Sequence, residues 1–266
     1  MDTVVNGARI WFSLEGQGPT LVLIHGLGLD SRMWATTVPV FSRSFQVLTY
    51  DVRGHGRSEA PDRPGTAYSI ELLASDLREL LRAIGVDQAA VLGISMGGFI
   101  AQRFGVDYPE MARALVLVDT SNDPGPEGRQ ALGDRAATAE RDGMDPLIEP
   151  AINRWFTPEF QAAEPGVIQQ YKEVLAGTNP LGYAACARAG AAFHLGAELS
   201  RIQCPVLVVH GDRDLSFALE HAYRLKAAIP NARLVVLPDA SHIVHEHQPQ
   251  RFNDAVLAFL REAWGR

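Results

Sequence analysis

The chain has 266 residues and a formal net charge of −7, and its length fits a single α/β core that carries an insertion. Hydrophobic residues make up 47% and charged residues 21%, which is the composition of a folded globular protein. The acidic charge and the scattered lysines and arginines argue against a nucleic-acid partner. There is no signal-peptide pattern and no apolar run near the roughly 20 residues that span a bilayer, which predicts a cytoplasmic protein without a membrane partner.

The first predicted element is an antiparallel hairpin, because Asn6-Gly7 lies between two β-prone runs and both residues tolerate a positive φ. Short apolar runs follow, without the polar alternation of half-exposed strands. Amphipathic segments lie between them, clearest over residues 69–84, and another closes the chain at 252–260. This order predicts a mostly parallel sheet with helices on both faces. The apolar runs are residues 21–24, 47–50, 90–92, 115–118, 206–209 and 234–237.

The alternation stops between residues 121 and 195, where prolines separate helix-like pieces. An insertion at this point is expected over the carboxyl edge of the sheet, where open α/β sheets bind ligands. We therefore expect a core formed by residues 1–120 and 196–266, and a helical lid formed by residues 121–195. The alternative is an appendage remote from the site.

The motif Gly93-Ile94-Ser95-Met96-Gly97 follows a buried run and precedes a helical segment. A Gly-x-Ser-x-Gly in this context predicts a nucleophile elbow, in which small flanking residues allow a turn so sharp that the serine hydroxyl stands free. Ser95 is therefore the predicted nucleophile. The alternative is a serine that only caps the helix.

A serine nucleophile needs a base, and the base needs a carboxylate that orients it. Asp214 follows the run at 206–209 and is the predicted acid. Asp212 is nearer the strand and is suited to shaping the turn, and Asp119, after another strand, is a third choice.

His242 follows the run at 234–237 and is the predicted general base, because an imidazole titrates near neutral pH. His245 and His247 are alternatives, although their position predicts the start of the last helical region.

Hydrolysis through an acyl intermediate also needs N–H donors for the developing oxyanion. The loop His25-Gly26-Leu27-Gly28 predicts one donor, the Leu27 amide, and the elbow predicts the other, the Met96 amide. The alternative for this loop is a simple tight turn. The segment Asp51–Ser58 follows a different strand, and we interpret it as a structural turn.

The two cysteines, Cys186 and Cys204, have neither the spacing of a disulfide framework nor that of a zinc site. Both are predicted to be small buried hydrophobic residues. We expect no metal and no cofactor.

With these motifs in place, the chain resembles the α/β-hydrolase superfamily over essentially its full length. The resemblance is carried by His25-Gly26, the Asp51–Ser58 turn, the Ser95 elbow, the Asp214 loop and His242. More narrowly, the lid stretches at 154–160 and 179–187 are similar to those of 3-oxoadipate enol-lactonases.

Two segments depart from that narrower pattern. Those lactonases commonly carry Asn-Ser-Leu-Gly where this chain has residues 25–28, and the stretch Ala189–Leu195 is more apolar than theirs. An apolar lid favours a ligand less charged than a free dicarboxylate.

The resemblance implies an α/β-hydrolase fold and a serine hydrolase that cleaves a carboxylic ester or lactone, with Trp155 and Tyr183 of the lid contacting the substrate. Two alternatives use the same triad: a hydrolase that splits C–C bonds of vinylogous diketones, and a cofactor-free perhydrolase. A ligand receptor that binds without turnover is the alternative from another class. The expected partner is a small-molecule ester or lactone, and a homo-oligomer is possible.

Overall fold

The computed structural model describes residues 1–265, which form one eight-stranded sheet in the order β1-β2-β4-β3-β5-β6-β7-β8. The hairpin β1–β2 and the pair β2–β4 are antiparallel, and the remaining neighbours are parallel. The predicted mostly parallel sheet is therefore confirmed. Its strands are β1 (Asp2–Val5), β2 (Ala8–Glu15), β3 (Thr20–Ile24), β4 (Gln46–Tyr50), β5 (Ala89–Ile94), β6 (Ala112–Val118), β7 (Val206–Gly211) and β8 (Arg233–Leu237).

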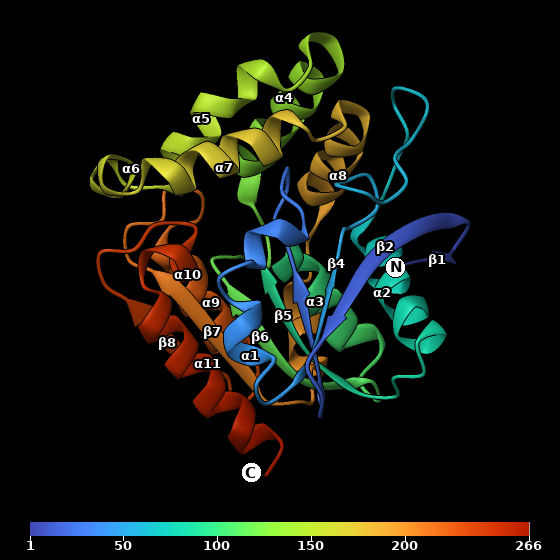
Figure 1. The fold of residues 1–266 in the computed structure, drawn as a ribbon, viewed down its shortest axis with the longest axis vertical. Coiled ribbons are helices and arrows are strands. Elements are labelled where there is room, and N and C mark those ends of the chain that lie inside the picture. The colour runs from blue at the N-terminus through green and yellow to red at the C-terminus, as the bar shows by residue number, and fades with distance from the viewer. Residues whose placement is uncertain (266) are drawn as a thin grey trace.

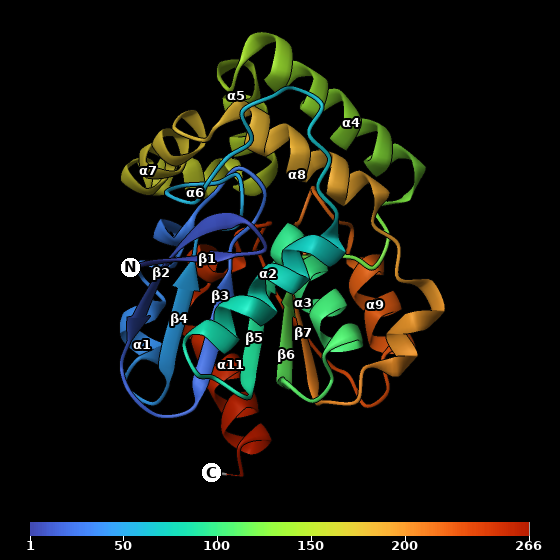
Figure 2. The same cartoon turned by 90° about the vertical axis from the view of Figure 1, so that its right-hand side faces the viewer.

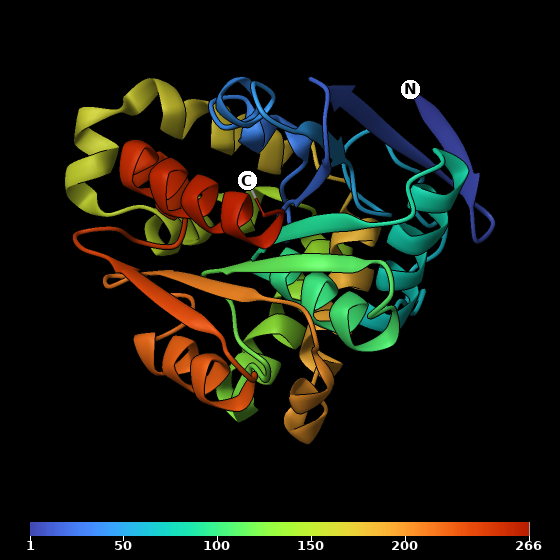
Figure 3. The ribbon, with the colours of Figure 1, turned by 90° about the horizontal axis from the view of Figure 1, so that it is seen from below.

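Helices cover both faces of the sheet (Figure 1, Figure 3). One face carries α1 (Val38–Phe41) and α11 (Pro249–Ala263), and the other carries α2 (Ile70–Ala83), α3 (Met96–Asp107) and α9 (Leu219–Ala228). Three short helices lie in connections: η1 (Ser31–Trp34), η2 (Gly196–Arg201) and α10 (Val244–His247). No helix within residues 1–265 combines the length and apolarity needed to cross a bilayer.

The core consists of two apolar layers separated by the sheet, because successive strand residues point to opposite faces. In β3, Leu21 and Leu23 join the layer under α1 and α11, while Val22 and Ile24 join the layer under α2 and α3. All four side chains are fully buried, as predicted for strands covered on both sides. Among the predicted apolar runs, that of β8 is the exception, since this strand lies at the edge of the sheet and most of its residues are partly exposed.

The segment between β6 and β7 forms helices only, and Figure 2 shows them stacked above the carboxyl ends of the strands. The contact between α4 and α8 holds this layer together. The layer meets the core where the Thr178 hydroxyl donates to the Gly28 carbonyl at 3.0 Å. Its helices are α4 (Gly125–Asp142), α5 (Asp145–Trp155), α6 (Pro158–Ala163), α7 (Pro165–Ala176) and α8 (Pro180–Ala192).

Candidate active site

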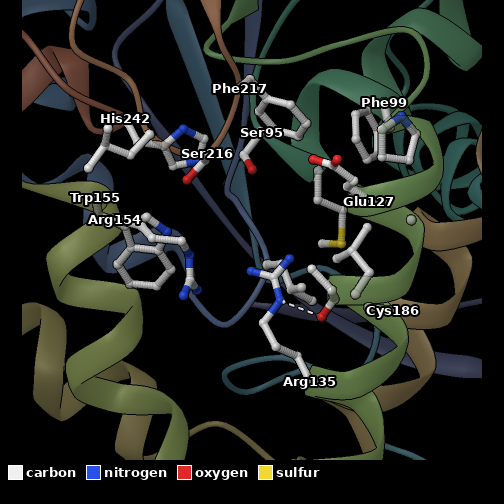
Figure 4. A pocket seen from close by; sticks show the side chains of 18 of the residues that line it. Ser95, Phe99, Glu127, Arg135, Arg154, Trp155, Cys186, Ser216, Phe217 and His242 are labelled. Atoms are coloured by element: carbon white, nitrogen blue, oxygen red, sulfur yellow. Dashed lines mark hydrogen bonds between the residues drawn. The ribbon is translucent and has the colours of Figure 1, made fainter.

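Ser95 lies at a sharp turn between β5 and α3, with φ +56° and ψ −118°. A positive φ is uncommon for a residue with a side chain, and such strained conformations gather at functional sites. The neighbouring glycines explain why the turn can close. A Cβ at Gly93 would lie 2.1 Å from the Gly97 carbonyl oxygen, and one at Gly97 would lie 2.4 Å from the Ile24 carbonyl oxygen. Ser95 thus has the geometry of a nucleophile elbow, and its hydroxyl points into a pocket (Figure 4).

The structure brings His242 and Asp214 together although 28 residues separate them. Nδ1 of His242 donates to Oδ2 of Asp214 at 2.9 Å, and both side chains are buried. The other carboxylate oxygen of Asp214 accepts the Ser216 and Phe217 amides, which fixes its orientation. Nε2 of the imidazole is left to face the pocket that Ser95 also lines.

Asp119 is also buried, and within the described residues it forms no hydrogen bond with His242. Its Oδ1 accepts the Gly211 amide at 2.8 Å and lies 3.7 Å from Nδ1 of His210. Burial and the negative charge of Asp214 raise the pKa of the Asp119 carboxyl well above its usual value. Nε2 of His210 donates to the Phe217 carbonyl, and burial lowers the pKa of this imidazole.

Asp119, His210 and Asp214 are close enough to suggest a cation site, with one ligand atom from each residue within 4.8 Å of the others. The carboxylate lone pairs of Asp214 that such a site would use already accept hydrogen bonds from His242 and two amides. We therefore interpret the cluster as part of the hydrogen-bonded support of the Asp214 loop.

The remaining alternatives lie away from the pocket lining. Asp212 is exposed at the turn after β7. His245 is buried against Trp34 and near the Met33 carbonyl, and His247 packs on Phe160.

The loop at residues 25–28 lies against the elbow, since a Cβ at Gly26 would lie 3.4 Å from the Cβ of Ser95. Within residues 1–265, the amides of Leu27 and Met96 have no hydrogen-bond acceptor. Both residues line the pocket beside Ser95. Two free N–H groups next to a serine hydroxyl have the composition of an oxyanion site.

The pocket has a volume of about 570 Å³ and lies between the carboxyl edge of the sheet and the helical layer. Trp155 and Tyr183 line it, and their contact with a substrate stays a prediction; Arg135 and Arg154, which the sequence analysis did not select, line it too. The guanidinium groups of Arg135, on α4, and Arg154, on α5, both point into the cavity (Figure 4).

Neither arginine forms a salt bridge with an acid of the described chain. Nε of Arg154 is buried without a partner, whereas Nε of Arg135 donates to the Ala131 carbonyl. Burial, and secondarily repulsion from Arg135, lower the pKa of Arg154 to about 10, so it remains a cation at neutral pH. Glu127 and Asp134 also line the pocket, but neither pairs with these cations.

Residues 19–249 match the family described as the alpha/beta hydrolase fold. The chain belongs to this family. It is 35% identical over 247 residues to 3-oxoadipate enol-lactonase 2 of Acinetobacter baylyi, covering 93% of this chain and 90% of the relative.

Solved structures agree with this α/β-hydrolase assignment. The enol-lactonase from Burkholderia xenovorans LB400 superposes with a TM-score of 0.92 at 33% identity, covering 98% of this chain and 99% of the other. A thermophilic esterase from Thermogutta terrifontis gives a TM-score of 0.91 at 30% identity, covering 98% and 97%.

The pocket changes the interpretation of the apolar lid stretch of this α/β hydrolase. Of the stretch Ala189–Leu195, only Gly190 is among the lining residues, and Phe193 instead stacks on Phe99 with ring centroids 4.5 Å apart. The apolar character of the stretch therefore reflects packing. The stretch gives no support to a less charged ligand, which stays a prediction, and the cavity is lined by the cationic Arg135 and Arg154.

We expect buried histidines to make the folded state of this α/β hydrolase less stable in mild acid. Burial is the largest cause that lowers the pKa of His55 to about 3 and that of His245 to about 4, against 6.5 for an exposed imidazole. Below pH 6.5 the unfolded chain binds these protons and the folded chain does not, so stability falls as pH falls. Each residue should lower the free energy of unfolding by about 2 kcal/mol between pH 6.5 and 5.

Urea unfolding at pH 7, 6 and 5 measures this loss. The variant His245→Gln removes one titrating group and should make the dependence shallower by about 1 kcal/mol per pH unit between pH 7 and 5. An unfolding free energy that is constant from pH 7 to 5 would contradict the expectation.

Proposed function

We propose that this protein is a serine hydrolase that cleaves a carboxylic ester or lactone through an acyl-enzyme. The observation that carries the proposal is one pocket lined by a serine in a strained elbow and by a histidine whose Nδ1 donates to a buried carboxylate. Similarity to enol-lactonases and to an esterase supports the same reaction class.

Each residue has one role in the proposed reaction. The Ser95 hydroxyl attacks the carbonyl carbon while Nε2 of His242 takes its proton, and Asp214 stabilises the resulting imidazolium. The amides of Leu27 and Met96 donate to the oxyanion of the tetrahedral intermediate. When the intermediate collapses, His242 returns the proton to the leaving oxygen, and water then attacks the acyl-enzyme by the same route.

We further propose that the substrate carries a carboxylate that binds Arg135 and Arg154. The Arg154 guanidinium is desolvated by burial and repelled by that of Arg135 in the same cavity, so an anion between the two relieves both effects. Trp155 and Tyr183 supply apolar walls between this cationic end and the serine.

A matched pair of substrates tests the charge preference. The 4-nitrophenyl monoester of a short dicarboxylic acid carries the proposed anion, and the 4-nitrophenyl ester of the monocarboxylic acid of equal length lacks it. Arg154→Met and Arg135→Met should each raise KM for the charged ester about 10- to 100-fold, since a charge-assisted hydrogen bond contributes about 1.5–3 kcal/mol. KM for the uncharged ester should change less than about threefold.

Arg141→Met is the matched control, because Arg141 is exposed on the same helix, α4, and pairs with the neighbouring Asp142. Equal losses on both esters in the pocket variants would contradict the carboxylate site but leave the hydrolase proposal intact. Absence of turnover on either ester and on an enol-lactone would contradict the hydrolase proposal itself.

A further inference from the structure

Two buried histidines connect the loop at residues 25–28 to the Asp51–Ser58 turn in a reciprocal manner. Nε2 of His25, in the loop, accepts the Val52 amide of the turn at 2.8 Å. Nε2 of His55, in the turn, accepts the Gly28 amide of the loop at 3.0 Å. Each segment therefore provides an imidazole lone pair to a backbone amide of the other.

This pairing requires both rings to be neutral with the proton on Nδ1. Nδ1 of His25 donates to the Gly26 carbonyl at 2.8 Å, and Nδ1 of His55 lies 3.4 Å from the Arg53 carbonyl. Both side chains are almost completely buried. Burial lowers the pKa of His25. Burial, and secondarily the nearby His25, lower the pKa of His55 to about 3. Both lone pairs are therefore available at neutral pH.

The Asp51–Ser58 turn is itself held rigidly. The Asp51 carboxylate accepts the Ser31 amide at 3.0 Å and both the amide and Nε of Arg57 at 2.9 Å. The Ser58 hydroxyl donates to the Asp51 carbonyl. His55 therefore projects from a fixed support.

The hydrogen bond that His55 accepts from the Gly28 amide holds the peptide between Leu27 and Gly28. Gly28 has φ +79°, its amide is held by His55, and its carbonyl accepts the Thr178 hydroxyl of the lid at 3.0 Å. On the other side, the Gly26 carbonyl accepts the Leu29 amide. The Leu27 N–H belongs to the same planar peptide as the Gly26 carbonyl, so the hydrogen bond to that carbonyl also fixes the direction of the N–H. Within residues 1–265 the Leu27 amide has no acceptor.

We propose that His55 is a positioning residue for the oxyanion donor of Leu27, with His25 as its counterpart in the loop. This role rests on the proposed hydrolase function. It assigns a catalytic purpose to the turn at residues 51–58, which the sequence analysis interpreted as purely structural. His55 is not among the residues that line the pocket, so its effect acts through the direction of one amide.

The test compares two replacements of His55 in the full-length protein. His55→Phe keeps a ring but removes the acceptor, and His55→Gln places an amide oxygen close to the position of Nε2. For His55→Phe we expect kcat on a 4-nitrophenyl ester to fall about 10- to 100-fold with KM within about threefold, because the oxyanion forms only after attack. His55→Gln should recover most of that loss.

The second measurement uses an aryl boronic acid, which forms a tetrahedral adduct with the serine and so reports on the oxyanion site. Its inhibition constant should rise in His55→Phe by about the same factor as kcat/KM falls. If His55→Phe does not fold, His55→Asn, whose side chain is too short to reach Gly28, replaces it with the same expectation.

Three results would overturn the proposal: unchanged kcat in the variant without the acceptor, a fall in kcat with unchanged boronate affinity, or equal loss in His55→Gln and His55→Phe. Active wild type together with inactive Ser95→Ala shows that the hydrolase function holds, so any of these results would refute the positioning role alone. Wild type without esterase activity would instead refute the hydrolase function, and the role of His55 with it.

Discussion

Replacing Ser95 with alanine is expected to reduce ester turnover by about 10⁴- to 10⁶-fold, because the reaction then lacks the atom that forms the acyl-enzyme. The fold should survive. The Ser95 side chain makes no hydrogen bond within the described residues, and alanine occupies the same turn with one atom fewer. The melting temperature should therefore change by only a few degrees.

Covalent labelling distinguishes a nucleophile from a residue that only shapes the pocket. A fluorophosphonate should add its mass to the peptide that contains Ser95 in the wild type and leave Ser95→Ala unlabelled. Ser121→Ala is the matched control, since Ser121 is another buried serine without a hydroxyl partner but lies outside the pocket lining. Labelling or near-normal turnover in Ser95→Ala would exclude the proposed mechanism.

The second large effect is expected for Asp214→Asn, with kcat lower by about 10⁴-fold. Asparagine can still accept the Ser216 and Phe217 amides, so the loop should keep its shape. It cannot supply the negative charge that stabilises the His242 imidazolium, and its amide group can favour the wrong imidazole tautomer.

Two neighbouring acids provide the controls for Asp214→Asn. Asp119→Asn should lower kcat less than about tenfold, because an asparagine oxygen can still accept the Gly211 amide and the hydrogen bond of His242 goes to Asp214. Asp212→Asn, at an exposed position, should change kcat less than about twofold. Steady-state kinetics on one aryl ester compares all three variants. An inactive Asp119→Asn beside an active Asp214→Asn would transfer the role of the acid to Asp119.

Local sequence was sufficient to predict those elements whose structure is decided by short-range sterics or by the spacing of apolar residues. Asn6-Gly7 adopts the two positive φ angles of a tight hairpin, and Val5 pairs with Ala8 as that turn requires. The Ser95 turn was likewise predictable, because Gly93 and Gly97 are the positions where a Cβ has no room. The apolar runs predicted buried strands for the same local reason, except at β8, whose exposure depends on its place at the edge of the sheet.

The choice of the acid that pairs with His242 depends on long-range packing, which a periodic pattern in the sequence does not determine. Asp119, Asp212 and Asp214 all follow strands in the sequence. Asp214 is the one that contacts His242, because the loops after the neighbouring strands β7 and β8 meet there.

The amino-acid sequence alone determined the order of elements, the parallel sheet with helices on both faces and the elbow at Ser95, because each follows from backbone sterics or from hydrophobic periodicity. Only the tertiary structure decided that Arg135 and Arg154 face one cavity, since the side of α4 or α5 that turns inward is set by its packing on other helices. It also decided that His25 and His55 each accept a backbone amide of the other's loop. Such contacts join residues distant in the chain, and their geometry exists only after the sheet has brought the strand ends together.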